Sequence, residues 1–150
     1  VVPGVTAASG CSAYSGIPLT HRGMSRSVRF MTGHFRNNEP LDINWQHVAD
    51  PDCTLVIYMG MANLDYISTQ LILAGLPAST PAAAIENGTT SRQLRVLSQL
   101  DQLADDVKQA SLKAPVMIII GEVVSLAEEL DWFQAELEKS GYDENTRIPA

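Results

Sequence analysis

Two short apolar segments constrain the fold of this chain more than any other feature: residues 54–59 (TLVIYM) and 116–120 (VMIII), the first followed by Gly60 and the second by Gly121. Both are too short for ordinary helices and are rich in β-branched residues, so they predict strands. Strands that are apolar along their whole length are usually buried on both faces. We therefore expect an α/β fold with three layers (α/β/α), in which helices cover both faces of a mixed sheet.

The rest of the chain alternates strand and helix patterns. Thr6 is expected to cap the first helix, and Asn87-Gly88 is expected to form a turn. The remaining expected strands are 27–32, 82–86 and 93–97, and the expected helices are 7–15, 43–49, 63–74, 101–110 and 126–137.

The length and composition indicate one domain. A chain of 150 residues with 45% hydrophobic residues can build one sizeable core. No apolar run approaches the roughly 18–20 residues that span a membrane, and no secretion leader is expected. Cys11 and Cys53 lack metal-ligand spacing and are too few for a disulfide framework, so we expect free thiols in the cytoplasm. The three histidines are scattered, so no metal is expected.

The net charge of −7 hides an asymmetry along the chain. Residues 1–38 contain four arginines and no acidic residue, whereas all 17 acidic residues follow. A short cationic segment on an acidic protein suits a compact anionic small molecule held by a few arginines. Nucleic acid is not an expected partner, because it needs a broad basic face. The alternative interpretation is an ordinary solvated surface strand.

Recognisable chemical motifs are absent from the sequence. It has no phosphate-binding loop, dinucleotide fingerprint, nucleophile elbow or zinc-binding helix, so covalent and metal chemistry are not expected. What remains are glycines and small residues at strand ends: Gly4, Met59-Gly60 and Asn87-Gly88. Ligands of open α/β sheets bind at such ends, although turn geometry and core packing explain the same residues.

Four stretches carry a resemblance to a known family. Residues 1–23 (VVPGVTAASGCSAYSGIPLTHRG), 54–60 (TLVIYMG), 81–93 (PAAAIENGTTSRQ) and 115–126 (PVMIIIGEVVSL) resemble, in order and spacing, the uroporphyrinogen-III C-methyltransferases of the tetrapyrrole methylase family. The resemblance spans residues 1–133, and its first stretch is the most specific part.

The resemblance implies a two-domain enzyme and identifies this chain as its C-terminal domain. Residues 1–5 then correspond to the inter-domain linker, 138–150 to a polar tail, and the N-terminal domain is absent from residues 1–150. The cofactor implied is S-adenosylmethionine, with S-adenosylhomocysteine as product and no metal. The implied reaction is two methyl transfers to ring carbons of uroporphyrinogen III, giving precorrin-2 for sirohaem, cobalamin or haem d1 synthesis. A homodimer is implied, and the isolated chain is expected to be inactive.

The resemblance also assigns site residues. Thr6, Ala7, Met59 and Gly88 match cofactor-contacting positions of the family. No catalytic residue is assigned, because two domain faces that clamp the cofactor need no protein nucleophile.

The substrate implied by the resemblance carries eight carboxylates, and the arginines of the basic segment are expected to bind them. Arg22, with His21, is the expected carboxylate contact, and Arg26 and Arg29 rank behind it. A structural salt bridge is the alternative role for Arg22. Two other functions remain open: a non-catalytic tetrapyrrole-binding or dimerisation module, and a methylase of the same fold with an RNA or protein substrate. The net charge counts against RNA.

Overall fold

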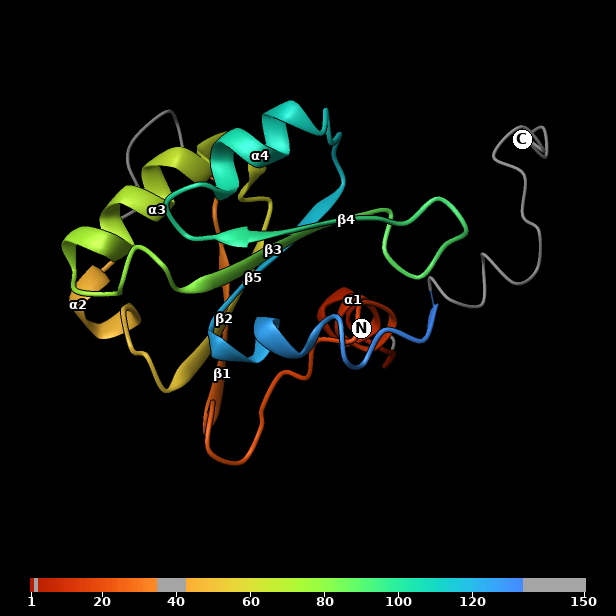
Figure 1. Cartoon of the computed structure of the whole chain (residues 1–150), viewed down its shortest axis with the longest axis horizontal. Helices are drawn as coiled ribbons and strands as arrows, with labels where there is room; N and C mark the ends of the chain where they lie inside the picture. Colours follow the sequence, from red (N-terminus) through yellow and green to blue (C-terminus); the bar gives the residue numbers. More distant parts are fainter. Residues whose placement is uncertain (2, 35–42, 134–150) are drawn as a thin grey trace.

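The computed structural model describes residues 1, 3–34 and 43–133, and it shows a mixed sheet with helices on both faces (Figure 1). The expected three-layer α/β/α fold is confirmed. The strands are β1 (Ser27–Thr32), β2 (Cys53–Tyr58), β3 (Pro81–Glu86), β4 (Leu94–Gln99) and β5 (Val116–Ile120). The helices are α1 (Ala7–Tyr14), α2 (Trp45–Val48), α3 (Leu64–Leu73) and α4 (Leu103–Gln109), with 3₁₀ turns η1 (Met61–Asn63) and η2 (Glu122–Leu126).

The strand order sets where the chain turns. The sheet runs β1-β2-β5-β3-β4, with β1 parallel to β2 and with β5 antiparallel to both β2 and β3. β1, β2 and β3 therefore point the same way and end at one edge of the sheet, which we call the carboxyl edge. Gly33, Met59 and Asn87 follow these three strands and lie at this edge.

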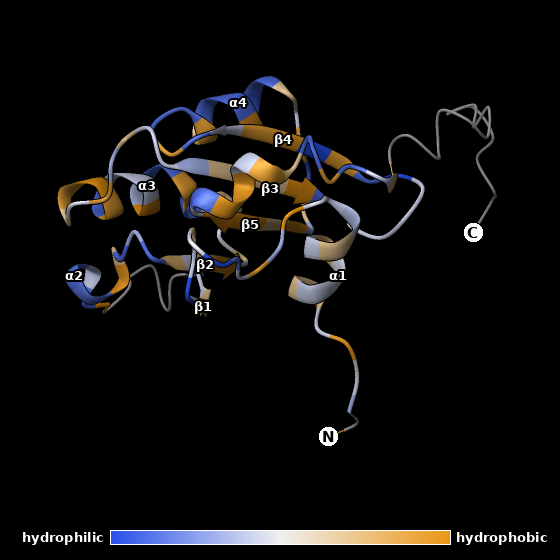
Figure 2. Cartoon of the chain, turned by 60° about the horizontal axis from the view of Figure 1, so that its bottom comes forward, coloured by the Kyte–Doolittle hydropathy of each residue, from blue (hydrophilic) through white to orange (hydrophobic). Residues whose placement is uncertain are grey.

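Each face of the sheet has its own core. On one face, α2, α3 and α4 pack over Leu55, Ile57 and Ile118. On the other face, α1 and the segment around η2 pack over Val56 and Ile119. These side chains are fully buried, which explains why both apolar segments lack polar positions. In Figure 2, β5 is orange between the two layers, whereas α1 is pale because it consists mainly of small residues.

Most expected elements are confirmed, with ends shifted by a few residues. The helix expected over 126–137 is wrong in its described part, where η2 is followed by turns up to Leu130. One helical bond is present there, from the N–H of Leu130 to the carbonyl of Leu126 (3.0 Å), but Arg95 donates to the carbonyl of Ala127 (3.4 Å) and the backbone of Gly16 packs against Ala127 and Leu130. The remainder of that segment and the tail 138–150 lie outside the described residues.

Two other expectations were tested. Cys11 and Cys53 are both free, as expected, and both are buried. Across residues 1, 3–34 and 43–133, none of the helices is long and apolar enough to cross a membrane.

Candidate functional site

The backbone at the carboxyl edge is held in costly conformations. Met59 (φ 54°), Asn87 (φ 48°) and Thr89 (φ 72°) all adopt the left-handed region, which residues other than glycine visit rarely. For a β-branched residue such as Thr89 this conformation is a true outlier. Such conformations persist only where surrounding contacts enforce them, and they concentrate at functional sites.

The first of these contacts joins the start of α1 to the end of β2. The Tyr58 hydroxyl accepts a hydrogen bond from the backbone N–H of Ala8 (3.2 Å) and is hydrogen-bonded to Oγ1 of Thr6. Thr6 occupies the N-cap position of α1, but its side chain caps no backbone N–H of the helix. The expected side-chain cap is therefore wrong, since Tyr58 supplies it. This arrangement ties Thr6 and the start of α1 to Tyr58, the residue before Met59.

A second contact packs the middle of α1 onto the turn after β3. A Cβ atom on Gly88 would lie 2.4 Å from Sγ of Cys11, and one on Gly10 would lie 2.9 Å from Cγ2 of Thr89. Both distances are too short for real atoms, so the close approach requires glycine at each position. Cys11 lies about one helical turn beyond Ala7. The start of α1, with Thr6 and Ala7, is thus bound to the residue before Met59, and Gly88 packs about one turn further along the same helix.

A third set of contacts holds the C-terminal end of α1. The buried side chain of Gln93 donates from Nε2 to the carbonyl of Tyr14 (2.9 Å) and accepts at Oε1 from the N–H of Thr89 (2.8 Å). Arg95 donates to the carbonyl of Ser15 (2.7 Å) and pairs with Asp131 (2.7 Å). A cation at this end of a helix is electrostatically favourable. α1 is therefore fixed along its whole length against the two strand ends.

The exposed part of this region is small and apolar. Thr6 and Ala7 are exposed, Met59 is 64% exposed and Val5 is 86% exposed, whereas Gly88 is half-buried. An exposed thioether offers an apolar surface against which a ligand or another domain can pack.

The expected substrate contacts lie at the other end of the sheet. His21 and Ser25 form a backbone bridge just before β1, and the N–H of Arg26 donates to the carbonyl of Asp52 (2.8 Å), the residue before β2. The six residues of β1 separate this turn from the carboxyl edge by about 17 Å. The structure thus does not bring His21 and Arg22 together with the cofactor candidates, and their role stays a prediction. In Figure 1 this segment is the orange loop at the foot of the sheet.

The three described arginines of the basic segment have different surroundings. Arg26 forms an ion pair with Asp52, and this hydrogen bond raises the pKa of the Arg26 guanidinium above its ordinary value. Arg29 donates to the carbonyl of His47. Arg22 is exposed, and its guanidinium has no ion-pair partner among the described residues. Among these three, Arg22 is the one whose guanidinium has neither an ion pair nor a hydrogen bond with the described residues, whereas Arg29 keeps its charge unpaired but is bound to a carbonyl.

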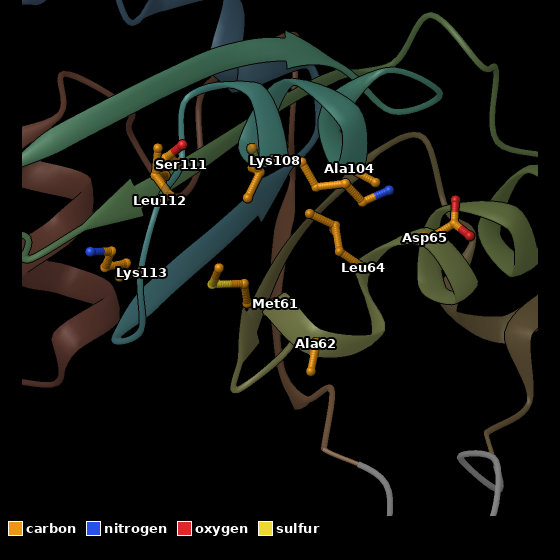
Figure 3. A pocket seen from close by; sticks show the side chains of 10 residues that line it. Met61, Ala62, Leu64, Asp65, Ala104, Lys108, Ser111, Leu112 and Lys113 are labelled. Carbon is orange, nitrogen blue, oxygen red and sulfur yellow. The ribbon is translucent and has the colours of Figure 1, made fainter.

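A cavity of about 390 Å³ lies on the opposite face from α1, between α3 and α4 (Figure 3). Lys113 and Asp65 stand at opposite ends of it, with Met61 between them, and Lys108 is bound to Asp105 (3.0 Å). None of the predicted site residues lines this cavity. Among the described residues, no group of His, Cys, Asp or Glu side chains is arranged to hold a metal ion.

Tyr58 and Gln93 bind the two ends of α1 to the sheet, and neither residue was predicted from the sequence to have this role. A signal for Tyr58 was present, because a tyrosine ending an otherwise aliphatic strand must find a hydrogen-bond partner for its hydroxyl. Gln93 carried no signal, since a glutamine after a Thr-Thr-Ser-Arg loop is usually exposed.

Known proteins share this fold and sequence. A siroheme synthase of Stutzerimonas stutzeri is 51% identical over 134 residues, covering 89% of this chain and 29% of that protein. A solved uroporphyrin-III C-methyltransferase of Thermus thermophilus, complexed with S-adenosylhomocysteine, is 31% identical with a TM-score of 0.69. The match covers 84% of this chain and 53% of that one. A cobalt precorrin-4 methyltransferase (TM-score 0.73, 21% identity, 82% of this chain and 52% of that one) shares the fold.

These matches establish the family. This chain spans less than a third of the siroheme synthase and about half of the solved Thermus chain. The family model for tetrapyrrole (corrin/porphyrin) methylases matches residues 1–104, which is more than half of the chain. The chain therefore belongs to the tetrapyrrole methylase family, as the resemblance predicted.

Proposed function

We propose that this chain is the C-terminal domain of a uroporphyrinogen-III C-methyltransferase and forms one wall of its S-adenosylmethionine site. Thr6, Ala7, Met59 and Gly88 contact the cofactor in this proposal. The observation that carries it is that α1, which begins with Thr6 and Ala7, is bound to the end of β2 just before Met59 and packs on Gly88 after β3. The solved Thermus thermophilus relative, complexed with S-adenosylhomocysteine, supports the choice of cofactor.

The residues at the carboxyl edge fit such a ligand. When bound, S-adenosylmethionine supplies a methyl group on a positively charged sulfur. Thr6 and Ala7 leave the start of α1 open to close approach, and the exposed side chain of Met59 provides an apolar contact. The clamped helix keeps these groups in place before the ligand arrives. Holding two reactants in register contributes up to about 7–11 kcal/mol in favourable cases and requires no protein nucleophile.

The substrate proposed is uroporphyrinogen III, methylated twice to precorrin-2. Its eight carboxylates need cationic partners, and Arg22 has a free guanidinium among the described residues. Because β1 separates Arg22 from Met59 by about 17 Å, a small substrate would not reach both ends of the strand. A macrocycle with carboxylates around its rim suits that separation better.

A further domain completes the site in this proposal. The relatives are longer than this chain, and Val5 and Met59 are exposed where such a domain would pack. The isolated chain is then expected to bind the cofactor weakly and to be inactive. A homodimer in the cytoplasm remains a prediction.

Methyl transfer from radiolabelled S-adenosylmethionine to uroporphyrinogen III tests the proposal. The chain joined to its native upstream half is expected to form precorrin-2, whereas the chain alone is not. Absence of transfer by the joined protein would reject the function.

Substitution of the arginines tests the substrate contact separately. Arg22→Ala is expected to raise KM for uroporphyrinogen III about 10-fold with little change in kcat, as for loss of a charged hydrogen bond. Arg26→Ala serves as the comparison, because Arg26 is already paired with Asp52. Equal effects of the two variants would reject the preference for Arg22.

A further inference from the structure

Tyr58 connects three parts of the carboxyl edge. Its carbonyl accepts a hydrogen bond from the N–H of Gly33 (2.7 Å), which ties the ends of β1 and β2 together. Its half-buried ring packs against the core beneath α1. Its hydroxyl accepts from the N–H of Ala8 and is hydrogen-bonded to Thr6. The next residue, Met59, turns away in the left-handed conformation.

The hydroxyl of Tyr58 accepts the capping hydrogen bond that the side chain of an N-cap threonine ordinarily accepts. A threonine at an N-cap normally turns its own Oγ1 onto the second or third N–H of the helix, here that of Ala8 or Ser9. In this structure Tyr58 accepts from Ala8, and Oγ1 of Thr6 points to Tyr58 instead. The side chain of Thr6 is therefore bound to Tyr58 and caps no N–H of its own helix.

We propose that Tyr58 is a positioning residue for the cofactor site: by capping α1 it leaves the Thr6 side chain free of the cap and holds the Thr6 hydroxyl in one orientation. This inference rests on the proposed function, because it assumes that Thr6 contacts the cofactor. Tyr58 itself does not touch the cofactor in this proposal and acts only through Thr6. Without the phenol oxygen, Thr6 turns back to cap Ala8 or Ser9.

Tyr58→Phe tests the proposal, because it removes only the hydroxyl and keeps the ring. In the chain joined to its upstream half, the variant is expected to weaken S-adenosylhomocysteine binding about 5- to 10-fold by calorimetry, the effect of one lost hydrogen bond. Thermal stability is expected to change little, since Thr6 takes over the cap. Tyr66→Phe on α3 is the matched control, because it removes a tyrosine hydroxyl on the other face of the sheet.

A double variant separates positioning from direct contact. If Tyr58 acts through Thr6, then Tyr58→Phe has no further effect on affinity once Thr6→Val has removed the threonine hydroxyl. Fully additive effects of the two substitutions would overturn the positioning role, and so would an unchanged affinity in Tyr58→Phe. Absence of binding by the unaltered joined protein would instead reject the proposed function. The two failures are thus distinguishable.

Discussion

Replacing Gly88 by alanine tests how tightly α1 packs against the turn after β3. The added methyl group would lie 2.4 Å from Sγ of Cys11, while its distance from Cβ of Cys11 and from Cγ2 of Ile85 would be an ordinary 3.4 Å. The sulfur is therefore the single serious obstacle. Because Cys11 is only 7% exposed, it has little room to move aside. Overpacking of this kind costs about 1–3 kcal/mol.

A double-mutant cycle gives the sharpest form of this prediction. Cys11→Ala alone is expected to cost about 1 kcal/mol for the lost buried sulfur. Gly88→Ala in the Cys11→Ala background is expected to cost less than about 0.5 kcal/mol, because the new methyl fills the vacated space. The coupling free energy between the two sites should then be about 1–2 kcal/mol.

Urea unfolding of the four proteins measures these free energies, with an unchanged m-value expected throughout. Gly88→Ala alone should lower Tm by about 3–10 °C. Gly4→Ala is the control, because its new Cβ would meet nothing within 4 Å. A fully stable Gly88→Ala protein, or strictly additive free energies, would refute the packing argument.

Three further predictions concern other contacts of the described residues. Gly33→Ala should destabilise the chain by about 3 kcal/mol or more in urea unfolding, because its Cβ would lie 2.4 Å from the Cα of Gly60, a backbone atom that cannot rotate away; a loss no larger than that of Gly88→Ala would contradict this. Arg95→Ala should lower the free energy of unfolding by about 2–3 kcal/mol, and Arg95→Lys should restore little of that loss, because one ammonium cannot reproduce the guanidinium's bonds to Asp131 and to two carbonyls. A lysine variant as stable as the unaltered chain would contradict this prediction. Burial raises the pKa of the Cys11 thiol, so iodoacetamide at pH 8 should alkylate Cys11 far more slowly in the native chain than in urea; peptide mass spectrometry measures the two rates, and equal rates would disprove this. The free energy of unfolding should also fall as the pH rises past the ordinary thiol pKa, because the thiol then loses its proton more readily in the unfolded chain than in the folded one. Unfolding curves at two pH values check this second statement.

The fold was predictable because its strongest signals are local. Residues 54–59 and 116–120 have no polar face, so they had to be central strands between two helical layers. The first helix and the turn at Gly88 were also marked by local residues. The strand order was not predictable in this way, since the antiparallel insertion of β5 between β2 and β3 depends on contacts between segments distant in the sequence.

The site was predictable only in part. The family resemblance named Thr6, Ala7, Met59 and Gly88, and their contact with a cofactor remains a prediction; the structure shows that α1 is bound to Tyr58 and packs on Gly88. The sequence pattern did not indicate that Tyr58 would replace Thr6 as the helix cap, because the capping bond between Ala8 and Tyr58 joins residues 50 positions apart. The segment after Leu126, where a helix was expected, also makes contacts with distant residues, since Arg95 donates to the carbonyl of Ala127.

The most direct test of the central claim is a calorimetric titration of S-adenosylhomocysteine. It is made first into this chain and then into the same residues joined to their native upstream half. The account predicts measurable binding only in the longer protein, because in the proposed function α1, Met59 and Gly88 supply one wall of the site and a second domain supplies the other. Equally tight binding by the chain alone would mean that the whole cofactor site lies within these residues, and would contradict the account.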